Sequence, residues 1–187
     1  MREPAEREEI RKDVILQKCF NVLTENGVEG ATIRNFSDAT GMTASSLYYW
    51  FEDKDDIVID ATIYGLNYIV EMLFDYAIEH IDNIDELCNG FVEYISNYKS
   101  QIRLVFQVAT SPIYGSKVRG HIKNISLLYD AYAKKISTHF DIPYNTLRIL
   151  VDNFISAIVD YVIWEDLSKI RRQMNYIAEV VKGGESS

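Results

Sequence analysis

Residues 32–54 read TIRNFSDATGMTASSLYYWFEDK, and this segment is the most informative part of the sequence. Thr32 is a favourable N-cap residue, so a short helix is expected over residues 32–40. Gly41 then interrupts the helix, because glycine tolerates the backbone conformations that a tight turn requires. A second short helix is expected from Thr43 to Trp50. The stretch therefore predicts two short helices joined by a tight turn.

The inner side of this helix pair is predicted to be apolar. Two helices that cross steeply bury a few apolar side chains between them, and Met42 is placed to plug the turn. The other buried positions are expected to be Phe36 and Ala39 on the first helix, with Leu47 and Phe51 on or just after the second. This pattern is typical of a helix-turn-helix.

The outer side of the second helix is small and rich in hydroxyl groups. Small polar side chains let a helix approach the phosphates and base edges of a major groove closely. Arg34 is the candidate for a bidentate contact with guanine, and Lys54 for a charged phosphate contact. The residues predicted to contact DNA are Thr32, Arg34, Thr43, Ala44, Ser45, Ser46, Tyr48, Tyr49 and Lys54. The competing interpretation, a helical hairpin with a polar turn, does not account for this coincidence of features.

The stretch Thr32–Ile57 resembles the signature of the tetracycline-repressor (TetR) family, and Leu47–Phe51 and Lys54–Ile57 match it most closely. The resemblance implies an all-α protein. In it a three-helix N-terminal helix-turn-helix domain is joined by a long helix to a C-terminal helical domain that binds ligand and dimerises. It also implies phosphate contacts from Thr32, Ser46, Tyr48 and Lys54, and contacts to bases or nearby backbone from Arg34, Thr43, Ala44, Ser45 and Tyr49.

Three positions depart from the family pattern. Trp50 stands where the family usually has a histidine, so an imidazole contact to phosphate is lost or replaced by an indole N–H. Ser37 stands where a small apolar residue is usual, and Ser45 where glycine is frequent. These departures leave the fold intact and the operator sequence open.

Upstream of the motif, residues 7–26 read as an amphipathic helix that ends at Asn26-Gly27. Val14, Cys19 and Leu23 recur near helical spacing on its apolar side. The N-terminal arm mixes basic and acidic residues, namely Arg2, Arg7, Arg11 and Lys12 with Glu3, Glu6, Glu8 and Glu9. This arm is either a solvated helix start, which the charge pattern favours, or a reach toward DNA phosphates.

Downstream, Asp53 is expected to cap a helix that runs to about His80. Further helices are expected over residues 84–98, 100–110, 116–140, 144–166 and 168–182. The predicted domains are a helix-turn-helix domain over residues 1–53 and a helical effector and dimerisation domain over residues 54–187.

Composition excludes several other classes of protein. The net charge is −9, so DNA binding must rest on a local surface. Cys19 and Cys88 lie far apart in apolar patterns and read as buried thiols, and the three histidines form no metal-binding or catalytic spacing. We expect no cofactor, no metal site and no enzymatic activity. The N-terminus lacks a signal-peptide core and no apolar run approaches ~20 residues, so a cytoplasmic protein without a membrane span is expected.

The long helices carry many aromatic residues, which either line an effector cavity or form ordinary core. The candidate pocket residues are Tyr64, Tyr68, Tyr94, Tyr98, Phe106, Tyr129, Tyr132, Phe154 and Asp160.

Segment 144–166 is apolar on most faces, so it is predicted to pack on the core and on a second copy of the chain. Segment 168–182 would join it, with an apolar stripe of Ile170, Met174, Ile177 and Val181. Two such helices from each of two chains would form a four-helix homodimer interface. Asp152 and Asp160 share a stripe that either faces solvent or arginines at the interface, or else lines the pocket.

These features predict a ligand-responsive transcriptional regulator, in particular a repressor that a small-molecule effector releases from a palindromic double-stranded DNA operator. The alternative function is a helical protein–protein interaction module without DNA binding. A helical-bundle enzyme is a third possibility, and no motif supports it.

Overall fold

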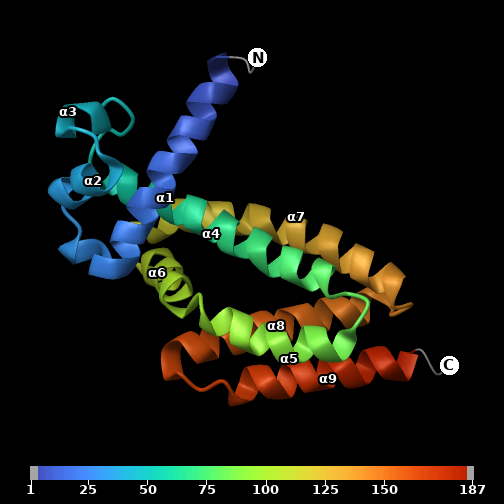
Figure 1. Cartoon of the computed structure of the whole chain (residues 1–187). Coiled ribbons are helices and arrows are strands. Elements are labelled where there is room, and N and C mark those ends of the chain that lie inside the picture. The colour runs from blue at the N-terminus through green and yellow to red at the C-terminus, as the bar shows by residue number, and fades with distance from the viewer. Residues whose placement is uncertain (1–3, 185–187) are drawn as a thin grey trace. The chain divides into compact units, whose positions relative to one another are not determined.

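The computed structural model describes the backbone of residues 4–184 and the side chains of residues 11–122 and 129–183. The described residues form helices and turns, with no strand among them, so the all-α prediction is confirmed (Figure 1). Arg2 and the side chain of Arg7 lie outside the described residues. In chain order the helices are α1 (Pro4–Gly30), α2 (Ile33–Thr40), α3 (Ala44–Leu47), α4 (Lys54–Glu79), α5 (Ile84–Ser96), α6 (Lys99–Thr110), α7 (Gly115–His139), α8 (Tyr144–Trp164) and α9 (Ser168–Gly184).

The described helices belong to two compact units. The first unit ends at Ile69 and also includes Leu104–His121, and the second comprises Val70–Arg103 and continues from Ile122. The boundary between the units therefore falls inside α4, α6 and α7. The functional division predicted between residues 53 and 54 does not coincide with this boundary, and it stays a prediction.

The first unit is built around the helix-turn-helix. Figure 1 shows α2 beside α1, and α3 next to α2. Phe36, Leu47 and Phe51 are almost fully buried, as predicted. Ala39 was expected to share this core and is instead exposed, although it lies only three residues after Phe36 in α2.

Two expectations for α1 have different outcomes. Gly27 has φ +70°, so regular helix geometry ends at the predicted position. Val14 is exposed, however, because the buried stripe runs through Ile15, Cys19 and Leu23.

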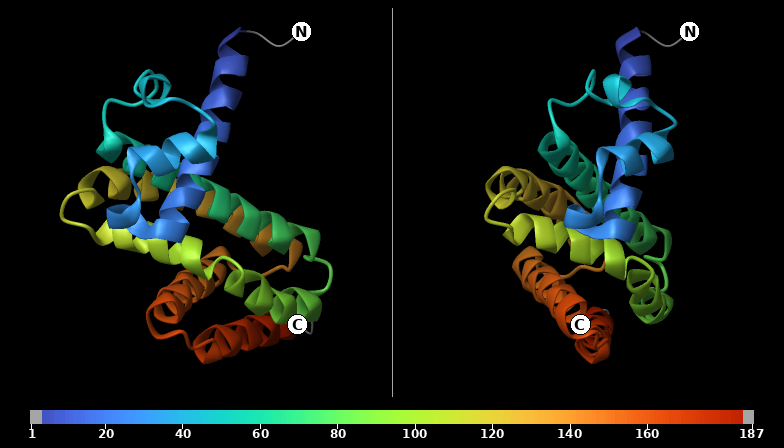
Figure 2. Two further views of the ribbon diagram at one scale, coloured as in Figure 1. Left: turned by 60° about the vertical axis from the view of Figure 1, so that its left-hand side comes forward. Right: turned by 90° about the vertical axis from the view of Figure 1, so that its left-hand side faces the viewer.

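The second unit packs its helices around α9. Figures 1 and 2 show α8 and α5 each beside α9. The predicted apolar stripe of α9 is confirmed at Ile170, Met174 and Val181, which are buried. Val181 joins a core cluster with Ala133, Phe140, Ile142, Leu147 and Leu150.

Two helices are shorter than predicted. α3 covers only Ala44–Leu47, and the chain then turns through Tyr48, Tyr49 and Trp50 so that Phe51 returns to the core. α8 ends at Trp164, because Glu165 adopts a left-handed conformation with φ 58° that a continuing helix does not allow.

α4 is the one helix among the described residues that is long and apolar enough to cross a membrane. Its apolar residues are interrupted by Asp60, Asn67 and Glu71, so α4 is not an uninterrupted apolar run. Within the first unit, Ile57, Val58 and Ala61 of this helix are fully buried, and its first turn carries Asp55 and Asp56. These features are those of a core helix in a globular protein.

Candidate nucleic-acid interface

The start of α2 is fixed by a reciprocal capping arrangement. The backbone N–H of Asn35 donates to the Thr32 hydroxyl at 3.2 Å, and the backbone N–H of Thr32 donates to the Asn35 side-chain oxygen at 2.9 Å. Thr32 therefore acts as the predicted N-cap. Both predicted contact residues here are accessible, since Thr32 is exposed and the Arg34 side chain is 90% exposed.

Gly41 makes the turn between the two short helices. Its φ of 72° and ψ of 19° place it in the left-handed region, where a side chain is strained. Its N–H donates to the carbonyl of Ser37 at 2.9 Å, and the N–H of Met42 donates to the same carbonyl at 3.2 Å. Met42 is only half-buried, so it plugs the turn less completely than predicted.

α3 presents the hydroxyl-rich face that the sequence predicts. Thr43 caps the helix by accepting a hydrogen bond from the backbone N–H of Ser46 at 3.2 Å, and the two hydroxyl oxygens lie 2.9 Å apart. Beneath this face, Leu47 is fully buried. The exposed members of the face are Thr43, Ala44, Ser45 and Ser46.

An aromatic turn follows α3. Tyr49 is 76% exposed, and its ring meets the Trp50 ring edge-on with centroids 5.5 Å apart. Tyr48 is also exposed. The predicted contact residues of α3 and of this turn thus share one accessible surface, which a buried side chain at Leu47 and another at Phe51 support.

The start of α4 carries both a basic residue and several acidic residues. Asp53 accepts a hydrogen bond from the backbone N–H of Asp56 at 2.8 Å, and the Asp56 carboxylate accepts one from the N–H of Glu52 at 3.1 Å. This arrangement confirms the predicted Asp53 cap. Lys54 is half-buried beside these carboxylates. Cations are therefore scarce around α3, and the face relies on hydroxyl groups more than on charge.

Comparisons with known proteins agree with this geometry. No protein-family model matches the chain. The chain is 27% identical over 128 residues to IcaR, the HTH-type negative transcriptional regulator of the biofilm operon icaADBC in Staphylococcus epidermidis, covering 66% of this chain and 68% of that protein. It is 23% identical over 168 residues to AcnR, an HTH-type transcriptional repressor of Corynebacterium glutamicum, covering 82% of this chain and 83% of AcnR.

Among solved structures, a TetR-family regulator from Mesorhizobium loti superimposes with a TM-score of 0.65 at 11% identity, covering 99% of this chain and 98% of that one. The chain has the TetR-family fold. FadR from Bacillus subtilis, solved in complex with stearoyl-CoA, superimposes with a TM-score of 0.54 at 15% identity, covering 91% of this chain and 97% of FadR. These likenesses support a DNA-binding regulator and do not support the alternative of an interaction module without DNA binding.

The pocket residues predicted for a TetR-type effector domain are divided between the two units. Tyr64, Tyr68 and Phe106 belong to the first unit. The rings of Tyr64 and Tyr68 are stacked at 6.4 Å, and Phe106 is half-buried. The others belong to the second unit, and they are Tyr94, Tyr98, Tyr129, Tyr132, Phe154 and Asp160.

Within the second unit, three aromatic side chains that sequence reasoning missed connect the predicted ones. The Phe74 ring stacks on Tyr132 at 3.9 Å and lies 5.4 Å from Tyr129. Tyr76 stacks on Tyr94 at 4.4 Å, and Tyr94 in turn lies 5.3 Å from Tyr98.

The third missed residue is Phe91, which meets Phe154 edge-on at 5.2 Å. From the sequence alone, Phe91 is recognisable only as an apolar residue of its helix. Burial raises the pKa of the Tyr129 hydroxyl, as expected for a phenol within such a cluster.

The two acidic residues of α8 have basic neighbours in the second unit. Arg148 contacts the Asp152 carboxylate at 3.3 Å, and Lys169 of α9 pairs with Asp160. Among the described residues, no group of three histidine, cysteine or acidic side chains is gathered for a metal ion.

Proposed function

We propose that this TetR-fold protein is a homodimeric transcriptional repressor that leaves a palindromic operator when a small molecule binds it. The observation that carries the DNA-binding part is the exposed hydroxyl-rich face of α3 above the fully buried Leu47. A simple helical hairpin does not require four small residues and two tyrosines to be exposed together above a buried side chain. Sequence likeness to two HTH-type repressors supports the same conclusion.

The proposed DNA contacts are of two kinds. Thr32, Ser46, Tyr48 and Lys54 would bind phosphates and so fix the register of the protein on the duplex. Arg34, Thr43, Ala44, Ser45 and Tyr49 would face the bases or the nearby backbone. Arg34 is paired with Asp38 only at 3.8 Å on the exposed surface. Such a pair contributes little, so Arg34 can exchange it for a guanine edge.

A homodimer would place two such faces on one operator. The outer side of α8 leaves Ile149, Ile163 and Trp164 exposed, and α9 leaves Tyr176 exposed. A self-complementary contact through these helices would cover apolar side chains that water otherwise surrounds. Two-fold symmetry then requires the two copies of α3 to fit successive major-groove faces about 34–36 Å apart.

The effector is proposed to act through α4. This helix is 26 residues long and begins at Lys54, shortly after α3. From Val70 onward it belongs to the second unit, which also contains the clustered aromatic rings. A ligand that binds one tilt of α4 better than another shifts the population of DNA-competent dimers. A coupling of about 1–3 kcal/mol between the two sites is enough for a 5- to 150-fold change in affinity. The clustered aromatic rings favour an effector with apolar or aromatic surface. We place the protein in the cytoplasm.

A gel-shift titration with the intergenic DNA beside the protein's own gene tests the function. The wild-type chain should bind this duplex specifically at moderate salt, and an unrelated duplex of equal length should not compete. Arg34→Ala and Lys54→Ala should each weaken binding, whereas Lys135→Ala, an equal charge change on the exposed surface of the second unit, should not. Equal affinity for both duplexes, or equal effects of all three substitutions, would contradict the proposal.

A further inference from the structure

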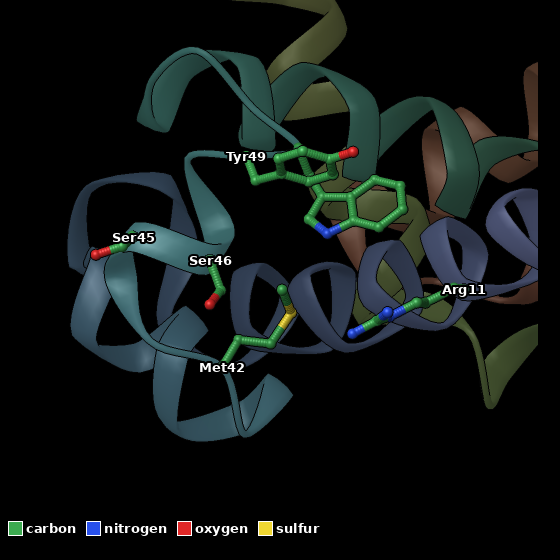
Figure 3. Close-up of a pocket in the computed structure, with 6 residues that line it drawn as sticks. Arg11, Met42, Ser45, Ser46 and Tyr49 are labelled. Atoms are coloured by element: carbon green, nitrogen blue, oxygen red, sulfur yellow. The ribbon is translucent and has the colours of Figure 1, made fainter.

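An open concavity of about 390 Å³ lies between α1 and the segment from Met42 to Trp50. Its lining combines one guanidinium, two hydroxyl groups, a thioether and two aromatic rings, supplied by Arg11, Met42, Ser45, Ser46, Tyr49 and Trp50. Figure 3 shows the Arg11 side chain reaching from α1 toward Met42 and Ser46. The concavity belongs entirely to the first unit and directly adjoins the proposed DNA-reading face.

Arg11 differs from the basic residue beside it. Lys12 forms an ion pair with Asp60 at 2.9 Å, and its ammonium lies 5.7 Å from the centre of the Phe51 ring. Its charge is therefore already paired within the first unit. Arg11 is exposed, and no carboxylate of the described residues lies within ion-pair distance of it. Its guanidinium therefore has no ion pair with the described side chains.

The Ser46 hydroxyl, which also lines the concavity, is suited to an anion as well. Ser46 Oγ lies 2.9 Å from Thr43 Oγ1, which already accepts the backbone N–H of Ser46. If the Thr43 hydroxyl donates to Ser46, the Ser46 hydrogen is free to donate to a further acceptor. A guanidinium and a hydroxyl donor across a concavity fit the two non-bridging oxygens of a phosphodiester. The rings of Tyr49 and Trp50 offer an apolar surface for the attached deoxyribose.

We propose that this concavity seats one backbone phosphodiester of the bound duplex, with Arg11 as its charged ligand and Ser46 and the Trp50 indole N–H as further donors. The proposal rests on the proposed function and adds a contact from α1, outside the helix-turn-helix. Because α1 packs against α2, this contact fixes the angle at which α3 enters the groove. In a chain of net charge −9 with acidic residues at Glu52 and Asp53, each cation near α3 carries a large share of the attraction, and Arg11 would add to those of Arg34 and Lys54.

The test compares two α1 variants in the full-length chain. Arg11→Ala removes the proposed ligand, and Lys18→Ala removes the same charge two turns further along the same helix face, about 10 Å away. Binding to a labelled duplex of the intergenic sequence is followed by fluorescence anisotropy at several salt concentrations. We expect Arg11→Ala to weaken binding about tenfold and to reduce the salt slope by about one unit, with a much smaller effect from Lys18→Ala. Circular dichroism confirms that each variant is folded.

A second variant keeps the test independent of charge. Trp50→Phe retains a ring but removes the indole N–H, and it leaves Trp164 as the remaining indole. Adding the duplex should change the fluorescence of the wild-type chain and leave that of Trp50→Phe nearly constant. Inorganic phosphate alone should produce neither effect.

Two outcomes separate this inference from the proposed function. Failure of the wild-type chain to bind the duplex overturns the proposed function itself. Specific binding by the wild-type chain, with equal losses in Arg11→Ala and Lys18→Ala and no fluorescence change at Trp50, overturns the phosphodiester site alone.

Discussion

The phenolic hydroxyl of Tyr114 donates a hydrogen bond to the Asp55 carboxylate at 2.9 Å. Tyr114 lies in the corner between α6 and α7, and Asp55 lies in the first turn of α4, next to the proposed phosphate ligand Lys54. The corner is held in shape by the Ser111 hydroxyl, which accepts the backbone N–H of Ile113 at 3.2 Å. The hydrogen bond therefore joins two segments that are 59 residues apart in the chain, the α6–α7 corner and the start of α4 next to the helix-turn-helix.

Tyr114→Phe should lower the free energy of unfolding by about 0.5–1 kcal/mol, because it removes one hydrogen bond while the exposed Asp55 regains water. A double-mutant cycle with Asp55→Ala, followed by urea unfolding at fixed protein concentration, isolates the pair. A coupling energy below ~0.3 kcal/mol, which is within ordinary additivity error, would show that the contact does not hold the corner.

Gly65→Ala should destabilise the protein by about 1–3 kcal/mol through overpacking. A Cβ at this position would overlap the ring of Phe20, and that ring is buried and has no room to swing aside. The measurement is the urea midpoint under conditions in which the slope of the transition is unchanged.

Gly120→Ala is the matched control for that substitution. Gly120 also lies within a helix of the first unit, but nothing stands within 4 Å of the added Cβ. Its replacement should stabilise the chain by about 0.5–1 kcal/mol, because alanine loses less backbone entropy than glycine in a helix. If Gly65→Ala is as stable as Gly120→Ala, α4 does not approach Phe20 as closely as the structure shows.

Sequence reasoning identified the helix-turn-helix because local rules determine it. Thr32, Gly41 and Asp53 are caps and turns whose partners lie within four residues, so short spacings were sufficient. The buried positions Phe36 and Leu47 followed from helical periodicity in the same way. Periodicity did not predict the exposure of Ala39, a small apolar residue that gains little from burial.

The contacts that sequence reasoning missed join distant segments. The Tyr114–Asp55 bond and the stacking of Phe74 on Tyr132 connect helices that are far apart in the chain. Periodicity says which face of a helix is apolar but not which other helix covers that face, so such partners were not predictable. Arg11 was predicted only as one of several charges in a mixed arm, because nothing in the sequence placed it in one concavity with Ser46.

Both cysteines should be unreactive in the folded protein. Burial raises the pKa of Cys19 to about 12 and, with Asp85 nearby, that of Cys88 to about 11. Because the thiolate is the nucleophile, a chromogenic disulfide reagent at pH 8 should react more than about a hundredfold faster in guanidinium than in native buffer. Mass spectrometry assigns each labelled site, and rapid labelling of either thiol without denaturant would contradict this expectation.

Glu165 should make the stability of the protein depend on pH below about 4.5. The Arg103 guanidinium at 2.6 Å and the Lys99 ammonium at 3.0 Å hold the pKa of this carboxyl below its ordinary value of 4.5. A carboxyl whose pKa is lower in the folded chain than in the unfolded chain stabilises the fold above the unfolded value, and this contribution is lost as pH falls through the folded value. Glu165→Gln should therefore melt about 1–3 °C below the wild-type chain at pH 7, and the difference should shrink as the pH falls below 4.5. Glu179→Gln is the control, since this exposed residue of α9 has no ion pair among the described side chains. A difference between wild type and Glu165→Gln that stays constant from pH 7 to 3 would mean that the α8–α9 corner is not held to α6 by charge.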